Sequence, residues 1–333
     1  MEQFENKTIV ITGATGLIGS NLVERFMGLN NVNIIIIARN EEKVKNGFAD
    51  YIGKHNFKYY IQDICCPFTL EEKVDFIFHA AGPMEGKIIA NYPVDVIRPN
   101  INGTINCLEF LKTQQEKTGL KGRLILFSSV TVYGNISGKD ITVKEEDTRV
   151  TDSLNVGNSC YSQSKRMIEV MAYAYAKQYG IDVVIARFST VYGKTRFVPD
   201  TAFYEFIKKA LSEKNIELNS AGLARRDNIY VDDAISALLV IASKGKIGEA
   251  YNVSSNGEGG NFASVDEIAI TISQIANSIN NKSGNIKVVF KNKNIIQRAA
   301  GIKLDNNKLK ELGWNLSFGL EQGIAETLNG MRV

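Results

Sequence analysis

Three side chains in this sequence have the chemistry and the spacing to move a proton. Ser129 closes the apolar run Leu124–Phe127, with Ser128 between them. Tyr161 and Lys165 stand four positions apart at the start of a helical pattern, so both would lie on one face of that helix. A hydroxyl opposite a Tyr/Lys pair suits proton transfer to or from an oxygen atom. The competing interpretation is a buried strand followed by an unrelated amphipathic helix, because so short a pattern recurs by chance.

The apolar run before Ser129 predicts a strand that is buried on both faces of a parallel sheet. Open α/β sheets bind ligands at the carboxyl ends of such strands, where the two serines fall. Similar runs at residues 7–12, 33–38, 57–62, 74–79 and 181–187 alternate with helical patterns. We therefore expect a doubly wound, parallel α/β sheet of Rossmann type. We assign residues 1–193 and 226–252 to this dinucleotide-binding domain, and residues 194–225 and 253–333 to a smaller, mostly C-terminal substrate-binding lobe.

A glycine-rich turn follows the first predicted strand. Gly13, Gly16 and Gly19 lead directly into an amphipathic helical pattern. Glycines let the backbone approach a pyrophosphate, which free N–H groups and the helix N-terminus stabilise. The sequence thus predicts a dinucleotide cofactor, with further contacts at the ends of later strands. The expected cofactor-binding residues on these grounds are Gly13, Thr15, Gly16, Leu17, Ile18, Gly19, Arg39, Asp63, Ile64, Ala80, Ala81, Gly82 and Phe188.

The end of the second predicted strand bears on the choice of cofactor. An acidic residue commonly ends this strand in NAD-binding folds, but here the sequence reads Ala38-Arg39-Asn40. An arginine can neutralise a 2′-phosphate, which favours NADP. The alternative is NAD, with Arg39 only stacked on the adenine.

The composition is that of an ordinary soluble enzyme. The 333 residues carry a net charge of +3, with 44% hydrophobic and 23% charged residues, so no nucleic-acid surface is expected. No apolar run approaches the length of a membrane span and no signal peptide is evident, which predicts a cytoplasmic protein without a membrane partner. The cysteines lack metal-ligand spacing, so we expect free thiols and no metal at Cys65, Cys66, Cys107 and Cys160.

Two stretches could contact an anionic substrate. Arg225 and Arg226 precede a short apolar stretch, and arginines bind pyrophosphates well. An exposed charged turn is an equally open interpretation of this pair. Met84 and Lys87 follow the fourth predicted strand in a loop at the ligand-binding edge, so both are further candidates for substrate contact.

Six motifs occur in order between Gly13 and Asp233. They are Gly13-x-x-Gly16-x-x-Gly19, Asn100-x-Asn-Gly-Thr, Ser128-Ser-x-x-Val-Tyr-Gly134, Tyr161-x-x-x-Lys165, Arg187-x-x-x-Val-Tyr-Gly193 and Arg226-Asp-x-Ile-Tyr-Val-Asp-Asp. Together they closely resemble the extended short-chain dehydrogenase/reductase family, in particular its nucleotide-sugar epimerase/dehydratase branch. The resemblance implies a homodimer formed through helices that start near Asn100 and Tyr161.

The resemblance also implies roles for individual residues. Tyr161 would be the general acid/base, and Lys165 would hold the nicotinamide ribose and lower the pKa of the phenol. Ser129 would bind the reacting sugar oxygen. Asn100 and Tyr161 would lie near the cofactor. Arg226 would grip the phosphates of a nucleotide-diphosphate sugar. The other substrate residues expected by resemblance are Val130, Thr131, Thr190 and Arg298.

The residues after Ser129 separate the activities within the branch. Sugar 4,6-dehydratases have a motif similar to Thr-Asp-Glu-Val-Tyr-Gly at this point, and uronate decarboxylases also carry a glutamate immediately before Val-Tyr-Gly. Val130 and Thr131 cannot transfer protons near neutral pH, so the sequence favours hydride transfer at C4, as in 4-epimerases and 4-ketoreductases. A contrary signal is Ser-Cys160-Tyr161 with Lys165-Arg166, which resembles decarboxylases. Dehydration or decarboxylation is therefore the alternative function, and a non-catalytic cofactor-binding regulator is a third.

Overall fold

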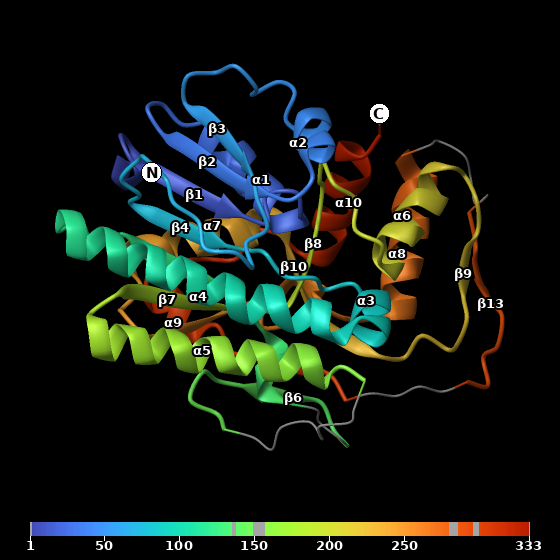
Figure 1. The fold of residues 1–333 in the computed structure, drawn as a ribbon. Helices are drawn as coiled ribbons and strands as arrows, with labels where there is room; N and C mark the ends of the chain where they lie inside the picture. The colour runs from blue at the N-terminus through green and yellow to red at the C-terminus, as the bar shows by residue number, and fades with distance from the viewer. Residues whose placement is uncertain (1, 135–137, 149–156, 280–285, 296–299, 333) are drawn as a thin grey trace.

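A parallel sheet of seven strands forms the centre of the computed structural model, which describes residues 2–134, 138–148, 157–279, 286–295 and 300–332 (Figure 1). The strand order is β11-β7-β5-β4-β1-β2-β3, and every neighbouring pair is parallel. This confirms the predicted fold class and its six strands. The seventh strand, β11, lies at the edge of the sheet beside β7. The strands are β1 Thr8–Thr12, β2 Asn33–Ala38, β3 Phe57–Ile61, β4 Phe76–His79, β5 Arg123–Ser129, β7 Asp182–Phe188 and β11 Ala250–Val253.

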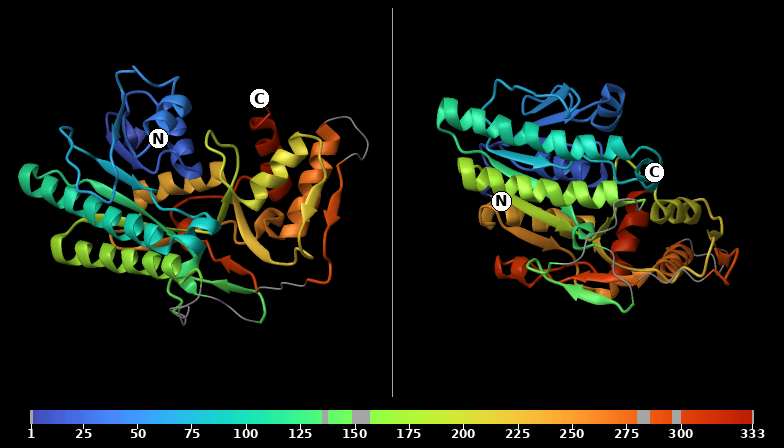
Figure 2. Two further views of the ribbon diagram at one scale, coloured as in Figure 1. Left: turned by 45° about the vertical axis from the view of Figure 1, so that its right-hand side comes forward. Right: turned by 60° about the horizontal axis from the view of Figure 1, so that its bottom comes forward.

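Helices cover both faces of this sheet because its strands are apolar on both sides. Along β5, Leu124 and Leu126 pack with α4 (Pro93–Thr118) and α5 (Ser159–Tyr179). The alternate residues Ile125 and Phe127 belong to the core that includes α1 (Leu17–Met27) and α7 (Val231–Lys244). The period of two along a strand explains this division. Figure 2 shows α4 and α5 running side by side in both views.

Helix α4 begins earlier than the sequence predicts. It starts at Pro93 and contains Asn100 in its second turn, whereas we expected a start near Asn100. Pro99 lies inside the helix and has no N–H to donate to the carbonyl of Asp95, and prolines usually mark a helix boundary. Pro93 takes the first helical position, where a missing N–H costs nothing.

Outside the central sheet, α6, α8, β9 and β13 lie together at the right of Figure 1, and β6 lies at its lower edge. Three small sheets have the strand orders β12-β10-β8, β13-β9 and β14-β6. Trp314 is buried after the short helix α9, which is followed by Gly313 with a φ of 94°. The strands are β6 Ile141–Val143, β8 Thr190–Tyr192, β9 Ile216–Leu218, β10 Arg225–Tyr230, β12 Phe262–Ser264, β13 Val288–Phe290 and β14 Ile302–Leu304. The other helices are η1 Glu2–Phe4, α2 Glu41–Gly47, α3 Gly86–Asn91, η2 Val130–Tyr133, α6 Ala202–Leu211, η3 Glu258–Gly260, α8 Val265–Ile279, α9 Asn307–Glu311 and α10 Leu320–Gly330.

The four cysteines are free thiols. Among the residues that the structure describes, none of the helices combines the length and the apolar character needed to cross a bilayer.

Candidate active site

The three residues predicted to handle a proton meet where β5 ends and α5 begins. Ser129 is the last residue of β5, and Tyr161 lies in the first turn of α5. The Ser129 hydroxyl lies near enough to the Tyr161 phenol to lower its pKa. The Lys165 Nζ donates a hydrogen bond of 2.8 Å to the carbonyl of Phe127 and lies 5.7 Å from the centre of the Tyr161 ring. All three side chains are buried, so their interactions are little screened by water.

Burial decides the protonation states of this group. Loss of contact with water raises the pKa of Tyr161 to about 12, and the nearby Ser129 hydroxyl opposes the rise. Burial lowers the pKa of Lys165 to about 8, and the Glu169 carboxylate opposes the fall. Burial is the largest influence on the phenol in this structure, and the lowering of its pKa expected from Lys165 stays a prediction. At neutral pH the phenol holds its proton and Lys165 is mostly cationic, so the pair is ready to donate a proton.

The turn between β1 and α1 has the shape of a dinucleotide cradle. Gly13 has a φ of +68°, and a Cβ there would lie 2.6 Å from the carbonyl carbon of Ala80. A Cβ on Gly19 would lie 2.2 Å from the carbonyl oxygen of Gly13, so neither position has room for a side chain. Gly16 caps α1 and is exposed, and a Cβ there would meet only the Gly13 oxygen, at 3.3 Å. The open surface at Gly16 and the free N–H groups of the first turn therefore fit a pyrophosphate. Thr15, Leu17 and Ile18 lie half-buried along the same turn.

Asn100 provides a second sign of a bound group. Its Nδ2 donates to the Val96 carbonyl at 2.9 Å and to the Ser164 hydroxyl at 3.1 Å. Its Oδ1 is buried and has no hydrogen-bond partner in the described part of the chain. A Cβ on Gly82 would lie 2.8 Å from this oxygen and 3.7 Å from the Lys165 Nζ, so a glycine keeps the space open. A buried acceptor without a partner is costly, which fits a ligand that donates a hydrogen bond here.

The cofactor-binding residues expected after the second and third strands also come together. Arg39 is exposed directly after β2, and its charge acts on Asp63, which follows β3. The pKa of Asp63 is lowered chiefly by the backbone N–H of Cys65, which binds its Oδ1 at 2.9 Å. Ile64, next to Asp63, is buried. The remaining predicted contacts lie at two strand ends: Ala80 and Ala81 after β4, and Phe188 at the end of β7, with its ring centre 5.1 Å from that of Phe127.

The residues expected near the substrate are less uniform in their surroundings. Met84 is 68% exposed. Lys87 lies in α3 rather than in the expected loop, and its Nζ forms an exposed ion pair of 2.8 Å with Asp200. Val130 and Thr131 begin the short helix η2 directly after Ser129. The Oγ1 of Thr131 is buried and finds no hydrogen-bond partner among the described residues.

Only one of the two adjacent arginines remains available to a ligand. Arg225 donates to the carbonyl of Phe262 at 2.7 Å, and its guanidinium lies 4.7 Å from the centre of that ring. Arg226 is exposed on β10, whose residue Asn228 pairs with Thr190 of β8. Arg298 lies outside the described residues.

The sequence interpretation missed a buried polar group behind the proton-handling residues. Ser128 donates a hydrogen bond of 2.5 Å to the Glu169 carboxylate, which also forms an ion pair of 2.7 Å with Arg187. Glu169 follows Lys165 by four positions, so the same helical spacing that paired Tyr161 with Lys165 could have indicated it.

Comparison with known proteins agrees with this geometry. The sequence model of the NAD dependent epimerase/dehydratase family matches residues 9–254. The chain belongs to this family. The predicted family is thereby confirmed, and the chain is an enzyme of the NAD-dependent epimerase/dehydratase type.

Individual family members show how far the likeness extends. UDP-glucuronic acid decarboxylase 5 of Arabidopsis thaliana is 30% identical over 96% of this chain and 87% of its own length. A probable dTDP-glucose 4,6-dehydratase of Sinorhizobium fredii is 28% identical over 96% of this chain and 91% of its own. Among solved structures, a dTDP-glucose 4,6-dehydratase of Bacillus anthracis in complex with NAD has a TM-score of 0.76 and 25% identity, covering 97% of this chain and 96% of that one. The UDP-glucuronic acid 4-epimerase of Bacillus cereus, in complex with UDP-glucuronic acid and NAD, has a TM-score of 0.74 and 25% identity, covering 97% and 98%.

Proposed function

We propose that this enzyme transfers a hydride at C4 of a nucleotide-linked sugar, by 4-keto reduction or 4-epimerisation. The observation that carries the proposal is the end of β5. There Ser129 faces Tyr161 and Lys165, while the next two residues, Val130 and Thr131, offer no acid or base. Hydride transfer at a carbinol carbon needs one proton transfer at oxygen, which Tyr161 can perform, and none at carbon.

The side chains would divide the work as follows. Ser129 and Tyr161 bind the C4 oxygen, and Tyr161 gives its proton to that oxygen as a ketone is reduced or takes one back as an alcohol is oxidised. Lys165 stabilises the phenolate that forms, because its ammonium is held near the ring by the Phe127 carbonyl. A nicotinamide dinucleotide, when bound, supplies or accepts the hydride. Gly16 and the first turn of α1 would hold its pyrophosphate, with Asn100 and Lys165 nearer the nicotinamide ribose.

Dehydration or decarboxylation is the second candidate, and the comparisons give it a specific basis. UDP-glucuronic acid decarboxylases are prominent among the sequence relatives, at 30% identity. Arg166 adds to this likeness, but here its Nη1 donates to the carbonyl of Val132 at 2.8 Å. These reactions also require proton movement at a sugar carbon, for which Val130 and Thr131 have no suitable group. We therefore rank this candidate second.

The substrate would be a nucleotide-diphosphate sugar. Relatives named for UDP and dTDP sugars support this class, and the exposed Arg226 is placed to bind phosphates. The unpartnered Oγ1 of Thr131 would bind a sugar hydroxyl. The other proposed contacts are Met84, Lys87, Val130, Thr190 and Arg298.

We propose NADP as the favoured cofactor, with NAD as the alternative. Arg39 supports NADP, whereas the neighbouring structures with NAD and the adjacent Asp63 carboxylate support NAD. Steady-state rates with each cofactor decide between them.

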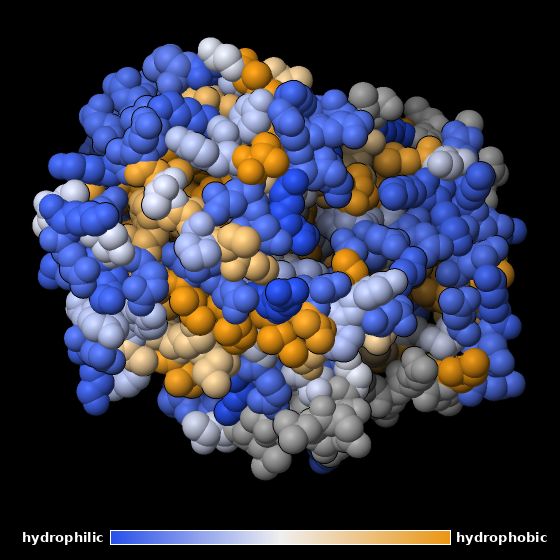
Figure 3. All heavy atoms as spheres, in the orientation of Figure 1, coloured by the Kyte–Doolittle hydropathy of each residue, from blue (hydrophilic) through white to orange (hydrophobic). Residues whose placement is uncertain are grey.

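We propose a cytoplasmic homodimer formed through α4 and α5. These helices expose several large apolar side chains, which gather over both helices in Figure 3. Exposed apolar patches of this kind commonly mark protein interfaces. The residues are Ile97 and Ile105 of α4 and Met167, Val170 and Tyr173 of α5. The proposed division into a dinucleotide-binding domain (1–193 and 226–252) and a substrate lobe (194–225 and 253–333) places α4 and α5 in the former.

Two assays separate the candidate functions. Purified enzyme with NADPH or NADH and a 4-keto sugar nucleotide should lose absorbance at the nicotinamide band. The same enzyme with UDP-glucuronate should release no carbon dioxide. Release of carbon dioxide or water without net cofactor use would establish the second candidate instead.

A further inference from the structure

Three successive residues at the end of β5 face three residues of α5. Lys165 donates a hydrogen bond to the Phe127 carbonyl, the Ser128 hydroxyl donates one to Glu169, and Ser129 lies near Tyr161 and lowers the pKa of its phenol. The three helix residues are spaced by four, so they form one stripe along α5. Only the first two belong to the proposed proton-handling group; Glu169 extends the same stripe by one more turn.

The Glu169 carboxylate is itself held in place. The Nε and Nη2 of Arg187, on β7, donate hydrogen bonds to this carboxylate at 3.0 and 2.7 Å. The side chain of Glu169 is 12% exposed and that of Arg187 is 14% exposed. The Nη1 of Arg187 donates to the hydroxyl of Tyr133 at 2.9 Å, and this hydroxyl donates to Asn252 of β11 at 2.8 Å. The bonds therefore connect α5 to three parallel strands and to the turn after Ser129.

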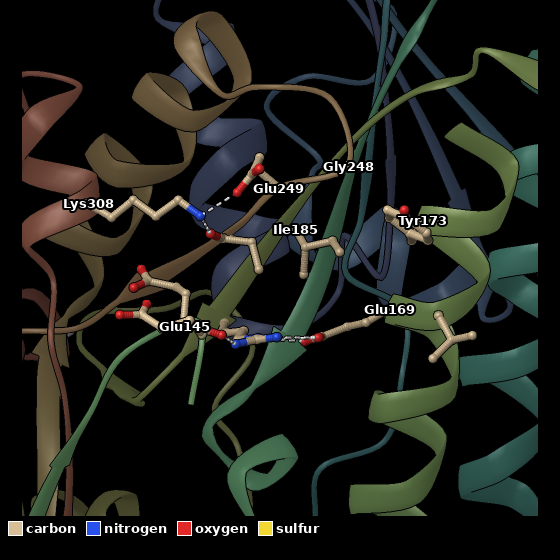
Figure 4. A pocket seen from close by; sticks show the side chains of 11 residues that line it. Glu145, Glu169, Tyr173, Ile185, Gly248, Glu249 and Lys308 are labelled. Carbon is tan, nitrogen blue, oxygen red and sulfur yellow. Dashed lines mark hydrogen bonds and ion pairs between the residues drawn. The ribbon is translucent and has the colours of Figure 1, made fainter. Parts of the chain in front are cut away.

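Figure 4 shows Glu169 reaching from α5 towards the sheet in a pocket of about 430 Å³. Glu145, Tyr173, Ile185 and Lys308 also line this pocket. A second carboxylate there, that of Glu249, forms an exposed ion pair of 2.6 Å with Lys308. Glu249 lies in the same pocket but makes no bond to β5, so it serves as a natural comparison for Glu169.

We propose that Glu169 is a positioning residue for the reaction: by binding Ser128 and Arg187 it holds the end of β5 in register with α5 and so keeps Ser129 opposite Tyr161 and Lys165. The proposal rests on the proposed function of those three residues. Misplacement of a reacting group by about 1 Å can cost a hundredfold in rate, so loss of this register should lower kcat.

Glu169 also supplies the negative charge that keeps Lys165 protonated. Around Lys165 lie the Phe127 carbonyl of β5, Tyr161 on its own helix, Asn100 of α4 through the gap at Gly82, and His79 of β4. Burial lowers the pKa of His79 to about 3, so this imidazole is uncharged. The Glu169 carboxylate opposes the effect of burial on the pKa of Lys165. Its removal should let Lys165 lose its proton at lower pH.

The test compares Glu169→Gln with Glu249→Gln in the full-length enzyme. We expect Glu169→Gln to lower kcat by roughly ten- to a hundredfold, with KM for the cofactor within about twofold of wild type. The loss of activity on the basic side should move to lower pH. Glu249→Gln should match the wild type in all three quantities. A wild-type kcat and pH profile in Glu169→Gln would overturn the proposal.

A second variant separates positioning from simple stability. Arg187→Met added to Glu169→Gln removes the buried charge that the single variant leaves unpaired, so thermal stability should recover in part. The kcat should stay low, because Ser128 still lacks its carboxylate. Recovery of kcat together with stability would show that the ion pair only stabilises the fold.

A third measurement needs no turnover and so distinguishes failure of this proposal from failure of the proposed function. The pH titration of Lys165, followed by the NMR chemical shift of its ¹³Cε atom, reports its protonation directly and needs no access of a reagent to the buried side chain. The curve of Glu169→Gln should lie at lower pH than that of the wild type. Coincident curves would contradict the role of Glu169, whether or not the enzyme acts on any sugar nucleotide tested.

Discussion

Alanine substitutions at two glycines of the β1–α1 turn should separate the stability of the fold from cofactor binding. In Gly19→Ala the new Cβ would lie 2.2 Å from the Gly13 oxygen and 2.8 Å from the Ala14 Cα, both backbone atoms. The turn must move to relieve this overlap, at a cost of about 1–3 kcal/mol in the free energy of unfolding. In Gly16→Ala the new Cβ would meet one atom within 4 Å among the described residues beyond its chain neighbours, the Gly13 oxygen at 3.3 Å. A φ of −101° suits alanine, so stability should change by less than about 0.5 kcal/mol.

Cofactor affinity, unlike stability, should fall clearly in Gly16→Ala. The methyl group of Gly16→Ala would cover the exposed surface on which we place the pyrophosphate, so the Kd should rise about tenfold, or about 1.4 kcal/mol. At a cofactor concentration of about 100 times the wild-type Kd, the ligand should stabilise the wild type by about 2.7 kcal/mol and Gly16→Ala by only about 1.4 kcal/mol.

Denaturant unfolding with and without the cofactor measures both effects. Gly28→Ala, at the other end of α1, is the control: its Cβ would come no closer than 3.5 Å to another atom, so neither quantity should change. If the cofactor stabilised Gly16→Ala by as much as the wild type, the pyrophosphate could not lie against Gly16.

Four further outcomes follow from the site. Tyr161→Phe should lower kcat by roughly 10²- to 10⁴-fold in steady-state assays, with little change in KM for the sugar nucleotide. Activity should fall as the pH rises through about 8, where Lys165 loses its proton. The folded-state pKa of Lys165 lies below its usual 10.5, so between these two values the unfolded chain binds more protons than the folded chain. The contribution of Lys165 to the free energy of unfolding should therefore rise with pH while activity falls. Denaturant unfolding measured across this pH range checks the prediction. Arg39→Ser should raise KM for NADPH about tenfold and leave KM for NADH unchanged; equal changes would remove the basis for NADP. Arg226→Met should raise KM for the sugar nucleotide about ten- to a hundredfold and hardly affect kcat, and an unchanged KM would exclude a phosphate contact.

Local patterns carried most of the fold prediction. The strand, glycine turn and helix around Gly13–Gly19 are set by residues adjacent in sequence, and β5 by an unbroken apolar run, so both could be recognised without knowledge of the tertiary structure. Tyr161 and Lys165 could be paired for the same reason, since one helix fixes their spacing.

Tertiary contacts account for what the sequence did not predict. The first turns of α4 were not predicted because Pro99 lies inside the helix, and a proline is tolerated there only through the packing of its surroundings. The pairing of Glu169 with Arg187 depends on the register of α5 against β7, which spacing along the chain cannot give. The rise in the pKa of Tyr161 could not be predicted from the sequence because burial, its largest cause, is a property of the whole fold.

Product analysis after turnover in D₂O tests most directly the claim that this site performs hydride transfer without proton movement at carbon. Enzyme, cofactor and UDP-glucose or UDP-glucuronate would be incubated, and the sugar products examined by mass spectrometry and NMR. The arrangement of Ser129, Tyr161 and Lys165, with Val130 and Thr131 beside them, predicts a product that keeps every carbon and oxygen of the sugar and carries no carbon-bound deuterium. Release of carbon dioxide or water, with deuterium on the sugar carbons, would contradict it.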